Sequence, residues 1–249
     1  MKGTINVQAE NIFPIIKKFL YSDHEIFLRE LVSNAVDATS KLKALSRMGE
    51  IKDDVGNTMI EVKLDEKKGT LSVIDRGIGM TEEEVEKYLN QVAFSGASEF
   101  LQKYEGKVDD AGIIGHFGLG FYSAFMVAKK VEVITKSWKD ETAVKWVCDG
   151  SPEFNITKSK KTQRGTEIIL HIDDESKEFL EEGRVAGILE KYCKFLPVEI
   201  KFGTKDNWVD DPKGEKDDKG EVKQVKETVD NIVNNPKPLW KKQPADLSA

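Results

Sequence analysis

The sequence predicts an α/β (α+β) two-layer sandwich, in which helices pack on one face of a mostly antiparallel, mixed sheet. Short β-branched segments occur in sequence-adjacent pairs joined by short turns, which favours antiparallel neighbours over a doubly wound parallel sheet. Amphipathic segments with helical spacing accompany them. With 249 residues, of which 39% are hydrophobic, the chain is long enough to bury one sizeable core.

The first elements follow one another closely. Residues 4–8 suit a short strand, residues 12–19 an amphipathic helix and residues 24–45 a long helix. Residues 59–64 and 70–75 alternate in the strand manner around a short charged turn that ends in glycine, which predicts a β-hairpin.

The second half of the chain continues with helices and further strands. Thr81 followed by Glu84 is the sequence of a capping box, so a helix is expected to begin there and to end near Leu89. Further strands are expected at residues 131–136, 143–148, 153–157, 166–172 and 198–202.

The long helix carries an unusual polar stripe. Four side chains at positions i, i+4, i+7 and i+11 fall on one narrow line of the helix: Glu30, Asn34, Asp37 and Lys41. The adjoining sector is apolar and suits a core: Phe27, Leu28, Leu31, Ala35, Ala38 and Leu42. The stripe offers a proton acceptor and a cation-binding oxygen at the edge of buried surface. A solvated polar face explains this helix taken alone equally well.

A second segment ends the hairpin's second strand in an aspartate followed by spaced glycines. Asp75 can accept a hydrogen bond from a ligand's amino group, while Gly77 and Gly79 permit close backbone approach. An ordinary Asx turn accounts for an isolated pattern of this kind.

A third segment places four glycines ahead of an apolar, helix-like run that continues to Val127: Gly112, Gly115, Gly118 and Gly120. Glycine-rich backbone before a helix presents N–H groups to phosphate oxygens. No Gly-Lys-Ser/Thr follows, so the segment is not a P-loop, and no dinucleotide fingerprint frames it. The glycine-hinged stretch at about 93–120 is a candidate lid; a surface helix with loose flanks is the alternative.

Composition limits the partners and the compartment. The net charge of −6 and pI near 5.4, without a basic stripe, argue against nucleic acid. Cys148 and Cys193 form no CxxC pair, which suits a reducing cytosol and argues against a zinc site. No apolar stretch has the length of a signal core or a membrane span, so a soluble, cytoplasmic protein without a membrane partner is expected.

The C-terminal part changes in composition. Residues 205–233 are rich in charge and poor in apolar side chains, and burial there cannot offset the entropy of ordering, which predicts a charged linker after a domain at 1–204. Residues 234–249 are then expected to begin another domain, as in an excised N-terminal part of a longer polypeptide.

Together these segments resemble the GHKL (Bergerat) nucleotide-binding fold, and their wording resembles the ninety-kilodalton heat-shock protein chaperones of the bacterial HtpG type. The motifs that carry the resemblance are YSDHEIFLRELVSNAVDA, DRGIGMT, FSGASEF, GHFGLGFYSAF and RGTEIILHI. The resemblance runs from about Asn6 to the last residue. It implies an ATP-binding and ATP-hydrolysing domain of a chaperone that acts on client proteins, forms a homodimer in its full-length form and uses ATP/ADP with Mg²⁺. It also identifies residues 234–249 as the start of the family's middle domain.

The resemblance assigns roles to residues of this chain. It implies that Glu30 is the general base, that Asn34 gives an oxygen to Mg²⁺, and that Asp75 accepts from the adenine amino group with support from the Thr166 hydroxyl or a water. Glycine-segment amides at residues 115, 118, 120 and 121 would contact phosphates. The full implied nucleotide-binding set is Asn34, Asp37, Lys41, Asp75, Gly79, Met80, Leu89, Gly115, Gly118, Leu119, Gly120, Phe121 and Thr166.

Two departures and several alternatives follow. Phe94 stands where many family members carry a lid lysine, and the family's catalytic arginine belongs to the middle domain, so slow or undetectable turnover with intact nucleotide binding is expected.

A sensor kinase should carry a phosphoacceptor histidine well before the asparagine, but His24 lies only ten residues ahead of Asn34. A gyrase-type or MutL-type ATPase should be more basic. A binding module that uses nucleotide only as a conformational ligand is the alternative from a different class.

Overall fold

The computed structural model describes residues 23–91, 96–104, 112–115, 118–139, 141–210 and 224–241. The strand expected at 4–8, the helix expected at 12–19 and Phe94 lie outside these residues. Much of the proposed lid segment lies outside them as well, although its central helix is described.

Within the described residues, eight strands form one sheet with the order β5-β4-β3-β6-β2-β1-β7-β8. Their bounds are β1 Ile60–Asp65, β2 Thr70–Ile74, β3 Ala128–Lys136, β4 Val144–Cys148, β5 Phe154–Lys158, β6 Gly165–Ile172, β7 Ile200–Asp210 and β8 Gln224–Ile232. Among the described strands, neighbours pair antiparallel except for β1 with β7, which pair parallel. The predicted mostly antiparallel, mixed sheet is confirmed.

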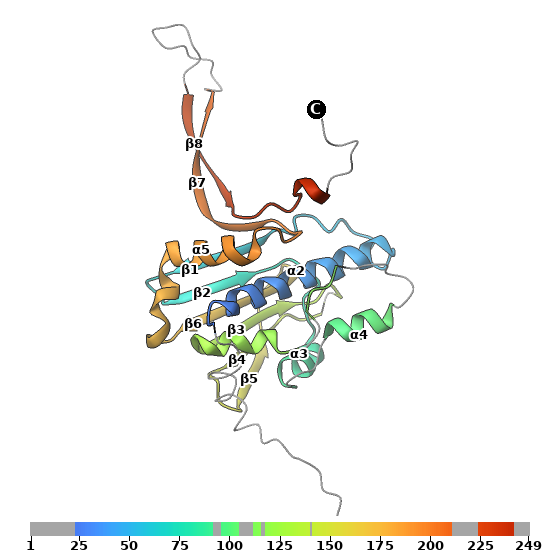
Figure 1. Cartoon of the computed structure of the whole chain (residues 1–249). Helices are drawn as coiled ribbons and strands as arrows, with labels where there is room; N and C mark the ends of the chain where they lie inside the picture. Colours follow the sequence, from blue (N-terminus) through green and yellow to red (C-terminus); the bar gives the residue numbers. More distant parts are fainter. Residues whose placement is uncertain are drawn as a thin grey trace, which may run out of the picture.

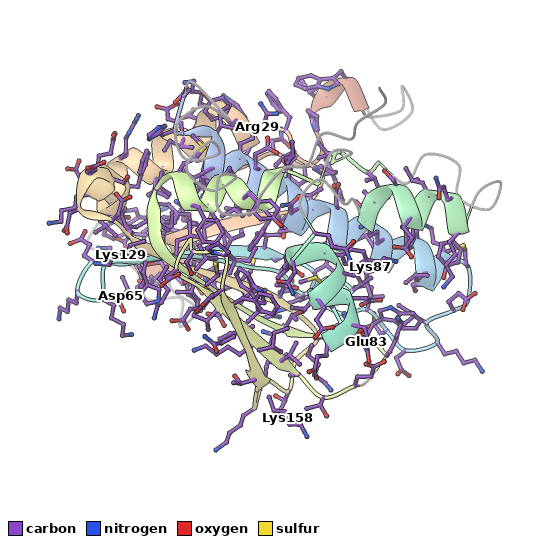
Figure 2. All side chains as sticks on the ribbon, turned by 90° about the horizontal axis from the view of Figure 1, so that it is seen from below. Arg29, Asp65, Glu83, Lys87, Lys129 and Lys158 are labelled. Carbon is purple, nitrogen blue, oxygen red and sulfur yellow. The ribbon has the colours of Figure 1, made fainter. Side chains whose placement is uncertain are left out.

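The helices lie together on one face of this sheet (Figure 1), and the view from below shows them as a separate layer above the strands (Figure 2). The α-helices are α2 Ile26–Arg47, α3 Glu82–Leu89, α4 Gly96–Lys103 and α5 Glu182–Cys193. Three 3₁₀ helices, η2 Gly120–Met126, η3 Asp174–Leu180 and η4 Leu239–Lys241, complete the described set. The predicted two-layer α/β sandwich is therefore confirmed, with a 3₁₀ helix in place of the helix-like run after the glycines.

The core lies between the two layers. Apolar side chains of α2, such as Phe27 and Leu31, are fully buried against strand residues such as Val131 and Leu170. Each buried side chain of this kind stabilises the fold by about 1.5–3 kcal/mol. A smaller cluster packs α4 onto the C-terminal half of α2 through Ala44, Leu45, Phe100 and Tyr104.

The β1–β2 hairpin and the start of α3 form as their local sequences predict. The β1–β2 pair forms a hairpin in which Lys68 N donates to Asp65 Oδ1 at 3.0 Å. At the start of α3 the Thr81 hydroxyl accepts from Glu84 N (3.2 Å), while Glu84 Oε2 accepts from Thr81 N (2.9 Å). The predicted capping box is present.

The predicted linker differs from the structure. The boundary at residues 204 and 205 falls inside β7, and residues 224–232 form β8, which pairs with β7 in the hairpin that leaves the body of the molecule in Figure 1. Cross-strand backbone hydrogen bonds and ion pairs, such as Lys226 with Asp206 at 2.8 Å, order this charged segment without burial. Residues 211–223 lie outside the described residues.

Candidate functional site

A pocket of about 1050 Å³ lies against α2, α3, α4 and the glycine segment. All of the predicted site residues line it: Glu30, Asn34, Asp37, Lys41, Asp75, Gly79, Met80, Leu89, Gly115, Gly118, Leu119, Gly120, Phe121 and Thr166. Three stretches that are distant in the sequence therefore meet around one cavity. The polar stripe of α2 faces this cavity, and Asp37 is only 4% exposed, so the stripe is not a solvated face.

Asp75 follows β2 and is almost completely buried at the base of the pocket, with 6% exposed. Its Oδ1 accepts from Gly77 N at 2.8 Å and from Thr166 N at 3.3 Å. Burial raises the pKa of Asp75 to about 6, against the lowering effect of these two backbone hydrogen bonds. Both hydrogen bonds accepted from described residues end on Oδ1, which leaves Oδ2 as an acceptor for a ligand.

The loop after Asp75 is fixed on both sides by backbone contacts. Ile78 N donates to Ala38 O of α2 at 3.2 Å, and Ile78 O accepts from Trp138 N at 2.8 Å. Gly79 has a φ of +61°, and a Cβ atom there would lie 1.8 Å from the carbonyl oxygen of Lys136. The loop therefore requires glycine at this position because both the φ and the space exclude a side chain.

Thr166 supports Asp75 through its backbone. Its N–H donates to the carboxylate and its carbonyl accepts from Asp75 N at 2.8 Å. The hydroxyl, which is expected to support the contact between Asp75 and adenine directly or through a water, shares a 3.0 Å hydrogen bond with the Thr135 hydroxyl in this structure, and Thr135 Oγ1 also accepts from Met80 N at 2.9 Å. Cross-strand pairing sets this geometry because Thr135 of β3 lies opposite Thr166 of β6.

Asp37 holds the glycine segment. Its two carboxylate oxygens accept from Ile114 N and Gly115 N, each at 2.8 Å. The expectation that the Gly115 amide faces phosphate therefore differs from this conformation, in which the amide is paired with an acid of α2. The physical reason is that a buried carboxylate requires hydrogen-bond donors, and two consecutive backbone amides supply them.

Glu30 lies where the glycine segment enters η2. Desolvation raises the pKa of Glu30 above its usual range, while the Arg29 guanidinium, 3.3 Å from Oε1, acts in the opposite direction. A Cβ atom at Gly120 would lie 2.7 Å from Glu30 Oε2, so the backbone and the carboxylate are in close approach. A carboxylate with a raised pKa is a better proton acceptor near neutral pH.

Asn34 and Lys41 complete the stripe. A Cβ atom at Gly115 would lie 3.7 Å from Asn34 Oδ1, so the amide oxygen faces the glycine segment. Burial lowers the pKa of Lys41, while the carboxylates of Asp37, Glu84 and Glu99 raise it. Within the described residues there is no cluster of three or more histidine, cysteine or acidic side chains that could hold a metal ion without a ligand's help.

Sequence reasoning missed several residues in and behind the pocket. Thr135 does not line the pocket but supports Thr166 and Met80, and it could have been found because strand alternation places its hydroxyl on the same buried face as Val131 and Val133. Among the other residues that line the pocket and carried no local signal are Arg29, Lys87, Tyr88 and Glu99.

Comparison with known proteins agrees with this geometry. Residues 21–177 match the family described as Histidine kinase-, DNA gyrase B-, and HSP90-like ATPase. The chain belongs to this family of ATPases, and its α/β fold is consistent with the family's ATPase domain. In the part of the chain that is described, no helix combines the length and the apolar character needed to cross a bilayer.

The chain is also similar to individual proteins named chaperone protein HtpG. The chain is 61% identical over 249 residues to the chaperone protein HtpG of Bacteroides thetaiotaomicron, covering 99% of this chain and 34% of that protein. It is 58% identical over 247 residues to the chaperone protein HtpG of Porphyromonas gingivalis, with the same two shares. A more distant HtpG, from Sulfurimonas denitrificans, is 38% identical over 242 residues, covering 96% of this chain and 38% of that protein. The chain spans about a third of the length of the curated relatives it matches.

Proposed function

We propose that the pocket binds ATP and hydrolyses its γ-phosphate bond, and that the chain is the nucleotide-binding part of an HtpG-type chaperone. The observation that carries the proposal is Asp75, a buried carboxylate that lines a cavity large enough for a nucleotide and whose two hydrogen bonds from described residues both end on Oδ1. An acceptor in that position suits the amino group of adenine. Gly79, Met80 and Thr166 line the same side, and Leu89 adds apolar surface.

The phosphates are assigned to the opposite end of the pocket. Gly118, Leu119, Gly120 and Phe121 line it where η2 begins, and backbone amides ahead of a helix suit phosphate oxygens. Gly115 can join them if its amide exchanges Asp37 for a phosphate oxygen. Asp37 and Lys41 line the same pocket along α2.

Mg²⁺ is the cofactor that the donor set suits. Mg²⁺ needs few protein ligands when substrate phosphates and water complete its shell, so the single amide oxygen of Asn34 facing the glycine segment is sufficient. When bound, Mg²⁺ would neutralise part of the phosphate charge, and the Asn34 amide oxygen would be its protein ligand.

Glu30 is proposed as the general base. It lies beside Gly120, at the phosphate end of the pocket, and its raised pKa favours accepting a proton from an attacking water. In this structure the Arg29 guanidinium pairs with the Glu30 carboxylate at 3.3 Å. Slow turnover is proposed for the 249-residue chain alone, because the family resemblance implies a catalytic arginine in the middle domain.

The activity of the whole protein follows from the relatives. They are named chaperones, and we propose the same role for this chain's protein, with client proteins as partners, a homodimer and a cytoplasmic location. Neither nucleic acid nor a membrane is proposed as a partner. The domain boundary remains a proposal at about residue 204, with the β7–β8 hairpin as a structured part of the connection.

Isothermal titration of the chain with ATP and ADP, with and without Mg²⁺, tests the binding proposal. Saturable binding of both nucleotides, tighter with Mg²⁺, is expected. An absence of binding to either nucleotide would leave only an interaction module and refute the proposal.

Glu30→Ala tests the role of the base. Hydrolysis is measured in this chain and in a fusion that supplies the remaining part of the Bacteroides thetaiotaomicron relative. The variant should lose at least about 100-fold in turnover because general bases contribute about 10²–10⁴-fold. Nucleotide affinity should stay within a few-fold, and a large loss of affinity would instead make Glu30 a structural residue.

A further inference from the structure

A carboxylate of the lid helix lies among basic side chains on the rim of the pocket. Glu99 of α4 places Oε1 and Oε2 each 2.8 Å from Lys87 Nζ of α3. The Tyr88 hydroxyl donates to Glu99 Oε2 at 3.0 Å. All three residues line the pocket, and Figure 2 shows Lys87 on α3 beside α4.

Further lysines surround the same carboxylate. Lys103 of α4 and Lys41 of α2 both line the pocket and interact electrostatically with Glu99. The Lys41 ammonium lies 5.9 Å from the centroid of Phe100, the residue that follows Glu99. Three helices thus direct cations toward one anion, and a phenolic donor completes its environment.

This arrangement has the chemistry of an anion-binding subsite that the protein fills itself. Ammonium groups and a hydroxyl are donors of the kind that bind phosphate oxygens. A polyphosphate carries more negative charge than a carboxylate and can therefore replace it. Resting on the proposed ATP function, we infer that Lys87 and Tyr88 form a phosphate-binding subsite, and that Glu99 occupies it until a nucleotide phosphate displaces the carboxylate.

The exchange has a consequence for the lid helix. Among the described residues, α4 contacts α3 through the ion pair of Glu99 with Lys87 and through Gly96, which packs against the Tyr88 ring. It contacts α2 through the apolar cluster that Phe100 and Tyr104 form. A phosphate that takes Lys87 breaks the ion pair and leaves the apolar cluster in place, so nucleotide binding weakens the contact of α4 with α3 more than its contact with α2.

Glu99→Gln tests the competition because it keeps the shape of the side chain and removes its charge. ATP and adenosine are titrated into the 249-residue chain and into the variant. Exposed ion pairs are worth up to about 1 kcal/mol, so ATP should bind about three- to fivefold more tightly to the variant. Adenosine, which has no phosphate, should bind equally to both proteins.

Two further variants provide the controls. Glu82→Gln removes the same charge from an exposed position of α3 that does not line the pocket, and should change ATP affinity by less than about twofold because solvent and salt screen an exposed charge. Lys87→Met should weaken ATP binding and should abolish the effect of adding Glu99→Gln.

The outcomes separate the two proposals. An unchanged or weakened ATP affinity in Glu99→Gln, or an equal gain for adenosine, would overturn the competition while leaving nucleotide binding in place. A wild-type chain that binds adenosine and ATP equally well would also overturn it, since no phosphate subsite would then contribute. If the wild-type chain bound neither compound, the proposed function itself would fail, and the subsite with it.

Discussion

Asp75→Asn should separate the stability of the fold from the recognition of adenine. Burial raises the pKa of Asp75 from 3.8 to about 6, so the folded protein resists ionisation of this group. A shift of about two pH units, at 1.36 kcal/mol per unit, corresponds to about 3 kcal/mol of destabilisation at neutral pH. The asparagine Oδ1 can still accept from Gly77 N and Thr166 N. The variant should therefore be at least as stable as the wild type at pH 7.5, by up to about 3 kcal/mol.

The sign of the pH dependence provides a sharper test. A carboxyl group whose pKa is raised in the folded state favours folding when protonated, so its contribution is fully present below pH 3.8 and is lost as the pH rises through about 6. Asparagine does not titrate. The difference in free energy of unfolding between variant and wild type, measured by urea denaturation, should be small at pH 4 and should increase up to about pH 6.5.

The affinity for adenine nucleotides should fall in Asp75→Asn, although the stability of the fold should rise. An amide that replaces Oδ2 with NH₂ presents a donor to the amino group of adenine, and such unpaired donors cost about 1–3 kcal/mol when buried. ADP affinity, measured by titration calorimetry at pH 7.5, should fall by about 10- to 100-fold. A variant that is less stable than the wild type at pH 7.5, or one that binds ADP within twofold of it, would refute this account of Asp75.

Two other substitutions test the packing and the electrostatics. Gly120→Ala places a methyl group 2.7 Å from Glu30 Oε2, so the carboxylate must move. The rate of ATP hydrolysis should fall by about tenfold or more, while the thermal unfolding curve stays normal. An unchanged rate of hydrolysis would contradict the close approach of Gly120 to Glu30. Glu132→Gln removes a buried carboxylate. Burial alone would raise the pKa of Glu132, but its hydrogen bonds with Lys130, Lys145 and His171 lower that pKa to about 2. A lowered pKa stabilises the fold above pH 4.5, and this contribution is lost as the pH falls toward 2. The variant should therefore lose about 1–2 kcal/mol at pH 7 and match the wild type near pH 2, as chemical denaturation at both pH values would show.

The parts of the fold that followed from sequence are those set by local chemistry. Strand alternation predicts the β1–β2 hairpin, and the side chains of Thr81 and Glu84 specify the start of α3 whatever packs around it. The helical spacing of Glu30, Asn34 and Asp37 places them on one side of α2, so their shared pocket needs only that this side meets the other motifs.

The parts that did not follow depend on partners that sequence spacing cannot identify. A glycine permits an amide to approach an anion, but it does not determine which anion, and Gly115 pairs with Asp37 in this structure. The charged segment after residue 204 lacks the burial that usually predicts order. Cross-strand hydrogen bonding between β7 and β8 supplies order there instead, and composition alone does not reveal it.

The two anion-binding features of the pocket share one physical cause. In this chain the Gly115 amide is paired with Asp37, a buried carboxylate, and the partly exposed Lys87 ammonium is paired with Glu99. A nucleotide that takes either donor must displace a carboxylate of the protein, so its affinity measures an exchange of anions rather than the filling of an open site. Asp37 belongs to α2, which is packed in the core, and Glu99 belongs to α4, so only the second exchange would change how α4 is held. Under the proposal, it is this second exchange that would link phosphate binding to the contact between α4 and α3.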